Sequence, residues 1–176
     1  MKYFILLSGF LFLFTAGYAT EERPKTPAER LKEAGALYFA YKPDDAFDEY
    51  ISLSKETNNR QAFLNAAFIA MEKNEPKKAV DIAQAAYKIY PKDREVIEMS
   101  AEAFLADGQY AAAEKLLAQL PEDKARSGFL YINLARAQIG LGDKKLAKYN
   151  LKLAVRAGTH PALANYLLGI LYEEDK

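Results

Sequence analysis

Residues 165–172 read NYLLGILY, and three earlier stretches repeat this pattern at intervals of 34 residues: FLNAAFIA at 63–70, IEMSAEAF at 97–104 and YINLARAQ at 131–138. The fifth position of each stretch holds a very small residue: Ala67, Ala101, Ala135 and Gly169. Mostly apolar residues stand one and four positions before it, which is the spacing of one helix face. The pattern predicts a helix that a neighbouring helix approaches closely, because a larger side chain would hold the two axes apart.

The same period continues beyond these helices. A turn position holds residues that suit the left-handed backbone at a helix end: Asn74, Gly108 and Gly142. An alanine then recurs at a fixed distance after each turn: Ala79, Ala113 and Ala147. These positions predict a second helix that nests against the first. Since neither helix can bury its apolar face alone, the units are expected to stack into a solenoid.

The repeat resembles the tetratricopeptide-repeat family, whose pattern is W-x2-L-G-x2-Y, then A-x3-F and P, on a 34-residue period. Residues 165–172 are the best match, with Asn165 in place of the Trp. The resemblance spans about 28–174 and implies an all-α, right-handed solenoid of about four helix pairs plus one terminal helix. We therefore predict a repeat domain at 28–176, preceded by a polar segment at 20–27.

Local signals refine these boundaries. Thr26, Pro27 and Glu29 predict a capping box with proline at the first helical position, so the array is expected to begin there. Pro121 comes early in its unit and predicts a second helix shortened to about Tyr110–Leu120.

The N-terminus predicts export. Lys2 is followed by a largely apolar run from Tyr3 to Ala16 and by small residues at Gly17 and Ala19, the order of a cleaved secretory signal. The run is about 14 residues long, shorter than the roughly 20 that span a bilayer as a helix. Residues 1–19 are thus a predicted signal peptide, cleaved after Ala19, and the short, lightly charged leader is typical of bacteria. A periplasmic or secreted protein is expected; the alternative is an uncleaved N-terminal membrane anchor.

Charge and cysteine content exclude several classes of function. The chain has 24 Lys and Arg residues against 24 Asp and Glu residues, and a nucleic-acid binder would show a basic excess. It has no cysteine, which rules out disulfides and thiolate metal sites. Its stability must therefore come from packing.

No motif for catalysis stands out. His160 is the single histidine, so neither a histidine pair for zinc nor a serine–histidine nucleophile has its partners. The segment 140–143 reads GLGD, but no strand precedes it, as a phosphate loop would require. Acidic clusters such as Asp44 and Asp45 lack the oxygen spacing of a calcium loop. We expect no enzyme activity, metal, cofactor, small-molecule substrate or nucleic acid.

The family resemblance implies that the first helix of each pair lines a concave groove that grips a peptide or helix of a partner protein. The matching positions on these helices are Leu64, Phe68, Met71, Glu98, Glu102, Ile132, Arg136, Tyr166 and Ile170. The best-known members use Lys and Asn here to hold a terminal carboxylate, and this chain lacks that clamp. Apolar residues around two central glutamates suit a ligand with apolar anchors and a basic residue. Alternatively, part of this stripe is core between helices.

The segment at 162–174 predicts a terminal helix whose apolar residues cover more than one face, including Leu167 and Leu171. An uncovered apolar strip marks an interaction surface. We predict that another chain covers it, either a second copy in a homodimer or a helix from a partner; alternatively, it tolerates solvent or folds against the turn at 158–159. The favoured function is a protein-binding scaffold or adaptor of the bacterial envelope. The alternative is a structural subunit that packs through this helix into a larger envelope or secretion complex.

Overall fold

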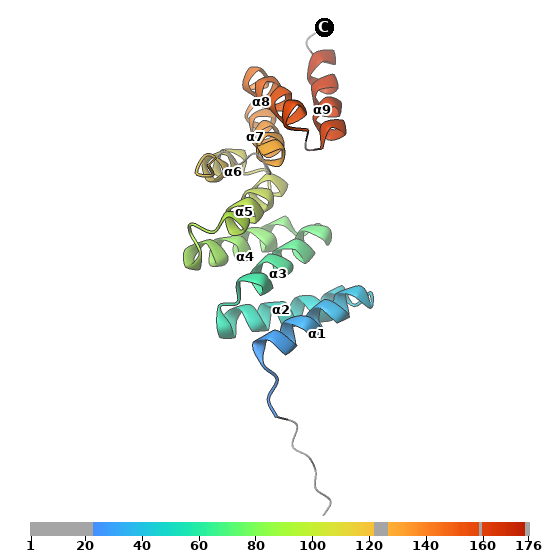
Figure 1. Cartoon of the computed structure of the whole chain (residues 1–176), viewed down its shortest axis with the longest axis vertical. Coiled ribbons are helices and arrows are strands. Elements are labelled where there is room, and N and C mark those ends of the chain that lie inside the picture. The colour runs from blue at the N-terminus through green and yellow to red at the C-terminus, as the bar shows by residue number, and fades with distance from the viewer. Residues whose placement is uncertain (1–22, 122–126, 159, 175–176) are drawn as a thin grey trace, which may run out of the picture.

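The computed structural model describes residues 23–121, 127–158 and 160–174. The predicted signal peptide and its cleavage site lie outside these ranges. Within them the chain forms nine α-helices and no strand (Figure 1). Their bounds are α1 Pro27–Phe39, α2 Pro43–Thr57, α3 Arg60–Glu72, α4 Pro76–Ile89, α5 Arg94–Ala106, α6 Tyr110–Leu117, α7 Ser127–Leu141, α8 Lys144–Ala157 and α9 Pro161–Glu173.

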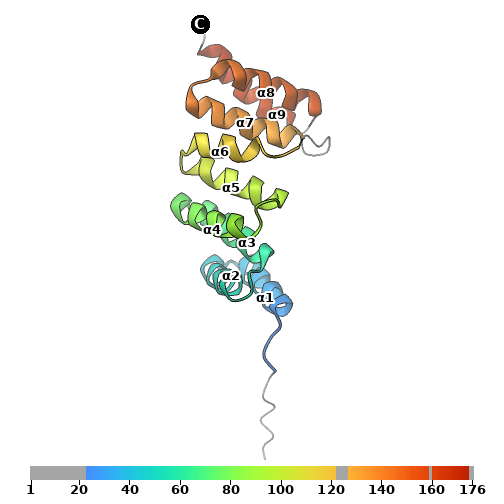
Figure 2. The ribbon, with the colours of Figure 1, turned by 90° about the vertical axis from the view of Figure 1, so that its left-hand side faces the viewer.

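The helices pack in sequential pairs. Each one contacts the next along the chain, and α5 also contacts the first helices of the units on either side, α3 and α7. Figures 1 and 2 show the pairs stacked along one long axis, with α1 near one end and α9 at the other. The sequence-based prediction of an all-α solenoid with four pairs and a terminal helix is confirmed.

The small residues of the first three repeats lie buried between the helices. Ala67, Ala101 and Ala135 are fully buried in the first helices, and the alanines after each turn, Ala79, Ala113 and Ala147, are fully buried in the second. Gly169 differs from its three counterparts. A Cβ atom placed on it would meet nothing within 4 Å. The corresponding face of α9 is therefore open.

The turns between paired helices share one geometry. Asn74, Gly108 and Gly142 have φ angles of 56°, 74° and 81°, the left-handed backbone that the sequence predicted. Tyr41 occupies the same place after α1 and has a φ of 59°. The next amide nitrogen donates back to a carbonyl of the last helical turn, at 3.0 Å from Lys42 to Leu37 and 2.9 Å from Glu75 to Ala70. A tyrosine thus fills a position that elsewhere suits glycine or asparagine.

Helix ends follow the local chemistry. Thr26 and Glu29 form the predicted capping box at the start of α1. The predicted end of α6 at Leu120 is wrong, because the helix ends at Leu117. The amides of Gln119 and Leu120 bond to carbonyls only three residues back, as in a tightened final turn. Pro121 disfavours helical backbone at Leu120, and the bonds of Gln119 and Leu120 replace the last helical ones.

Two clusters of buried apolar side chains form the core, and α7 contributes to both. The larger extends from α1 through α6 to Leu130 and Ala137, and the smaller joins α7, α8 and α9. A buried polar chain ties α6, α7 and α8 together in the same region. Asn150 donates to Gln138 at 2.8 Å, and Gln138 donates to Glu114 at 3.0 Å. These bonds satisfy the polar groups of Gln138 and Asn150, at positions where earlier units place apolar residues.

None of the helices in the described part of the chain is both long enough and apolar enough to cross a membrane.

Candidate functional site

The predicted groove residues lie on the first helices of the pairs, a surface that we call the first-helix face. Phe68 and Tyr166 leave 48% and 66% of their surface exposed, and Arg136 and Ile170 are also exposed. Leu64 and Met71 are partly buried against the larger core cluster. Most of the predicted positions can therefore reach a ligand.

Ile132 is an exception to this prediction. Only 2% of its surface is exposed, and it belongs to the core cluster that joins α7, α8 and α9. The alternative that part of the stripe is core between helices is correct at this position. An isoleucine at the junction of three helices gains more from burial than from the surface.

Hollows open on this face at two places. One, of about 190 Å³, lies between α1 and α3 and is lined by Tyr38, Asn65 and Phe68 among others. The other, of about 260 Å³, lies where α5, α6, α7 and α9 meet, with Arg136, Ile139 and Leu167 in its wall. Both are open hollows with apolar side chains and a few polar groups, as suits anchor side chains of a peptide or helix.

The two central glutamates are less exposed than a free acidic patch would be. Arg94 donates to Glu98 at 2.8 Å, and the side chain of Glu98 is 13% exposed. Burial raises the pKa of Glu102, while Asn133 and the charge of Arg136 oppose the shift. Arg136 also donates to Asn133 at 3.0 Å. The centre of the face is thus a mixed cluster of carboxylates, guanidinium groups and an amide.

Sequence reasoning missed the partners of these glutamates, although one signal was available. Arg94 precedes Glu98 by four residues, which places the two side chains together on one helix face. Asn133 and Arg136 come from α7, and only the stacking of α7 on α5 brings them to Glu102.

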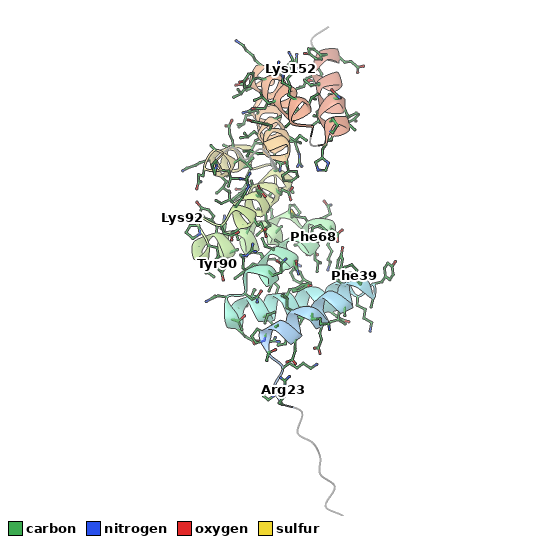
Figure 3. All side chains as sticks on the ribbon, viewed as in Figure 1. Arg23, Phe39, Phe68, Tyr90, Lys92 and Lys152 are labelled. Atoms are coloured by element: carbon green, nitrogen blue, oxygen red, sulfur yellow. The ribbon has the colours of Figure 1, made fainter. Side chains whose placement is uncertain are left out.

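Aromatic side chains gather at the α1 end of the first-helix face. The ring of Tyr38 meets Phe39 at 5.7 Å and Phe68 at 6.2 Å between centroids, both edge to face. Figure 3 shows Phe39 and Phe68 on the same side of the array, opposite Tyr90 and Lys92. Tyr38 and Phe39 were not among the predicted site residues, because the first unit is the most divergent copy of the repeat.

The terminal helix presents a different set of residues from the predicted one. Leu171 is 1% exposed and lies in the smaller core cluster, so its predicted role as an interface residue is wrong. Leu167 is partly buried and lines the hollow beside α7. The exposed apolar residues are Leu163, Tyr166, Ile170 and Tyr172. The packing of α9 on α8 sets the rotation of α9, which buries Leu171 and leaves a different face exposed.

The described residues contain no group of three His, Cys, Asp or Glu side chains that could hold a metal ion. His160 is exposed at the entry of α9, where its ring centroid lies 6.4 Å from that of Phe129.

The sequence was compared with known protein families. Residues 70–131, from the end of α3 into α7, match the tetratricopeptide repeat. This segment is similar to a tetratricopeptide repeat and covers about a third of the chain. Proteins with these repeats generally act as scaffolds for protein interactions, typically without enzyme activity. A search of curated proteins gives no match.

Solved structures share the repeat architecture. The chain is similar to MamA, residue 41 to the end, from Desulfovibrio magneticus RS-1, with a TM-score of 0.75, 14% identity and 85% of each chain covered. A MamA RS-1 double mutant gives a TM-score of 0.73 at 16% identity, with 86% of each chain covered. A tetratricopeptide-repeat protein from Parabacteroides merdae gives 0.50 at 13% identity, covering 84% of this chain and 72% of that one. At these identities the likeness establishes the repeat fold alone.

Proposed function

We propose that this protein is a non-enzymatic scaffold or adaptor of the bacterial envelope that grips a peptide or helix of a partner protein on its first-helix face. The observation that carries the proposal is the set of exposed apolar side chains on that face, above all Phe68, Tyr166 and Ile170. Phe68 lines the hollow between α1 and α3, and Leu167, next to Tyr166, lines the hollow where α9 meets α5, α6 and α7. Exposed apolar groups that cluster around a concave site are typical of protein-binding surfaces.

The partner's chemistry follows from the order of residues along the face. Aromatic and aliphatic groups lie at the α1 and α9 ends, and the charged cluster around Glu102 lies between them. Because burial opposes ionisation of Glu102 in the free protein, a partner cation placed against it would favour its charged form. We expect a ligand with one apolar anchor for Phe68, another for Tyr166 and Ile170, and a basic residue between them.

The test is binding of the partner recovered from an envelope extract. Replacing Phe68 by alanine removes an exposed anchor, and we expect affinity to fall about tenfold or more, because truncated aromatic anchors typically cost more than 1 kcal/mol. A Glu98→Gln, Glu102→Gln variant should weaken binding further and reduce its salt dependence. Titration of the purified partner at two salt concentrations measures both effects.

Glutamine is preferable to lysine here, since lysine would stand beside Arg94 and Arg136 and destabilise the fold. Tyr149→Ala and Asp81→Asn are matched controls, because both residues are exposed on second helices, away from the first-helix face. Unchanged affinity in folded first-helix variants would show that the partner uses another surface.

Location in the envelope rests on the leader at 1–19. We expect export with cleavage after Ala19, so that the mature chain begins at Thr20. The intact mass of protein isolated from its native host checks this. Full-length chain in the membrane fraction would favour the anchored alternative.

The open face of α9 supports a second candidate, a structural role in which another chain packs on that helix. Leu163, Tyr166 and Ile170 are exposed there, and no neighbour approaches Gly169. A second copy related by a two-fold axis would cover this face and make the protein a dimer. Sedimentation of the wild type against a Tyr166→Glu, Ile170→Glu variant tests the homodimer, because a monomeric wild type excludes it.

A further inference from the structure

A pocket of about 430 Å³ opens where α1 turns into α2. It is lined by Tyr38, Phe39, Tyr41, Pro43 and Glu72, so that aromatic rings and one carboxylate face the same space. Phe39 and Tyr41 are 81% and 93% exposed, which is unusual for large aromatic side chains. The pocket adjoins the hollow between α1 and α3, because Tyr38 and Phe39 line both.

The carboxylate in this pocket is not neutralised by a cation of the protein. Tyr38 donates its hydroxyl to Glu72 at 2.5 Å, and among the residues that the structure describes Glu72 forms no salt bridge. The adjacent cation, Lys73, pairs instead with Asp44. The pocket thus combines aromatic faces with a negative charge that a neutral phenol holds in place.

Tyr41, which lines this pocket, has a left-handed backbone conformation that tyrosine rarely adopts. Its left-handed φ of 59° is unfavourable for a bulky residue, and the equivalent turns use Asn74 and Gly108. With 93% of its surface exposed, the ring contributes little to the packing of the fold. Strain without compensating burial indicates a role other than stability.

Aromatic faces beside a carboxylate attract a positive charge through two separate interactions. The ring quadrupole draws a cation to the face, and Glu72 offers oxygen atoms to its N–H groups. A purely apolar anchor would leave the Glu72 carboxylate partly desolvated without a neutralising cation, which is unfavourable. We propose that this pocket binds a cationic side chain, arginine or lysine, of the partner protein.

This inference rests on the proposed function, because it names the group that the partner places at the α1 end of the first-helix face. The test uses acetylated pentapeptides with glycine around one central residue: arginine, its uncharged analogue citrulline, lysine or the uncharged norleucine. NMR follows the aromatic resonances of Tyr38, Phe39 and Tyr41 in the purified protein. We expect the arginine and lysine peptides to shift these resonances saturably, with affinities about five- to thirtyfold higher than those of citrulline and norleucine.

Two variants separate a binding role from a structural one. Glu72→Gln should reduce the affinity for the charged peptides to that for the uncharged ones. Tyr41→Gly should weaken binding several-fold while the melting temperature rises, because glycine relieves the left-handed strain. Tyr149→Ala, which alters an exposed tyrosine on α8, should change neither property.

Equal affinity for charged and uncharged peptides, or the absence of any shift at the pocket, would overturn the proposal. So would a Tyr41→Gly variant that binds as tightly as the wild type. The peptides probe the pocket without any partner, so a failure here is distinct from failure of the Phe68→Ala test of the proposed function.

Discussion

Replacing Ala101 by leucine is expected to destabilise the protein by about 1–3 kcal/mol or more. Ala101 is fully buried in α5, at the position where the repeat demands a very small side chain. Three further carbon atoms would have to separate α5 from its neighbours, because close-packed helices leave no room for them. Thermal or chemical denaturation measures the loss, and circular dichroism shows that the variant remains helical at low temperature.

Gly169→Leu is the matched control, since Gly169 occupies the same repeat position in α9. A Cβ there meets nothing within 4 Å, so leucine should fit. Replacing glycine inside a helix should even stabilise it by up to about 1 kcal/mol. A large loss of stability at Gly169 would mean that another chain covers this face of α9 in solution, and would support the dimer as the second candidate. If Gly169→Leu and Ala101→Leu lowered the free energy of unfolding by similar amounts, this face of α9 would not be open in solution.

Asn150→Leu is expected to cost about 1–3 kcal/mol, although leucine is the residue that the repeat itself places there. The equivalent positions are Ile82 and Leu116, which are both buried. Asn150 donates to Gln138 at 2.8 Å, and Gln138 is 3% exposed. Leucine would leave the Gln138 carbonyl oxygen buried without a donor, and the cost of that unpaired group outweighs the added apolar surface.

The double variant Gln138→Leu, Asn150→Leu should recover most of this loss. It removes both polar groups together, and Glu114, which is only partly buried, can turn to water. Replacing both partners of a buried hydrogen bond by apolar groups is often nearly neutral. Urea denaturation of the two single variants and the double variant gives the coupling free energy. Additive losses would show that the two side chains stabilise the fold independently.

The sequence determined the repeat and its register. The 34-residue spacing located the buried alanines and the left-handed turns, because those positions depend on local backbone geometry and on the size of one side chain. The capping box at Thr26 was predictable for the same reason, since its hydrogen bonds join residues three apart. The end of α6 was predicted less well, because helix ends depend on weak, competing bonds.

The exposure of the candidate site residues was predicted only in part. Phe68, Tyr166 and Ile170 were correctly expected at the surface, since helical periodicity alone separates the two sides of a helix. The burial of Ile132 was not predicted, because it depends on where α8 and α9 pack against α7.

Tertiary structure alone decided which residues from different units meet. The approach of Asn133 and Arg136 to Glu102 depends on how α7 stacks on α5, and the rotation of α9 buries Leu171 instead of exposing it. The pocket around Tyr41 and Glu72 likewise joins a turn after α1 to the end of α3, residues about thirty positions apart. A local repeat fixes which side chains a helix carries on each face, whereas the relative placement of the helices comes from the packing of all their side chains together.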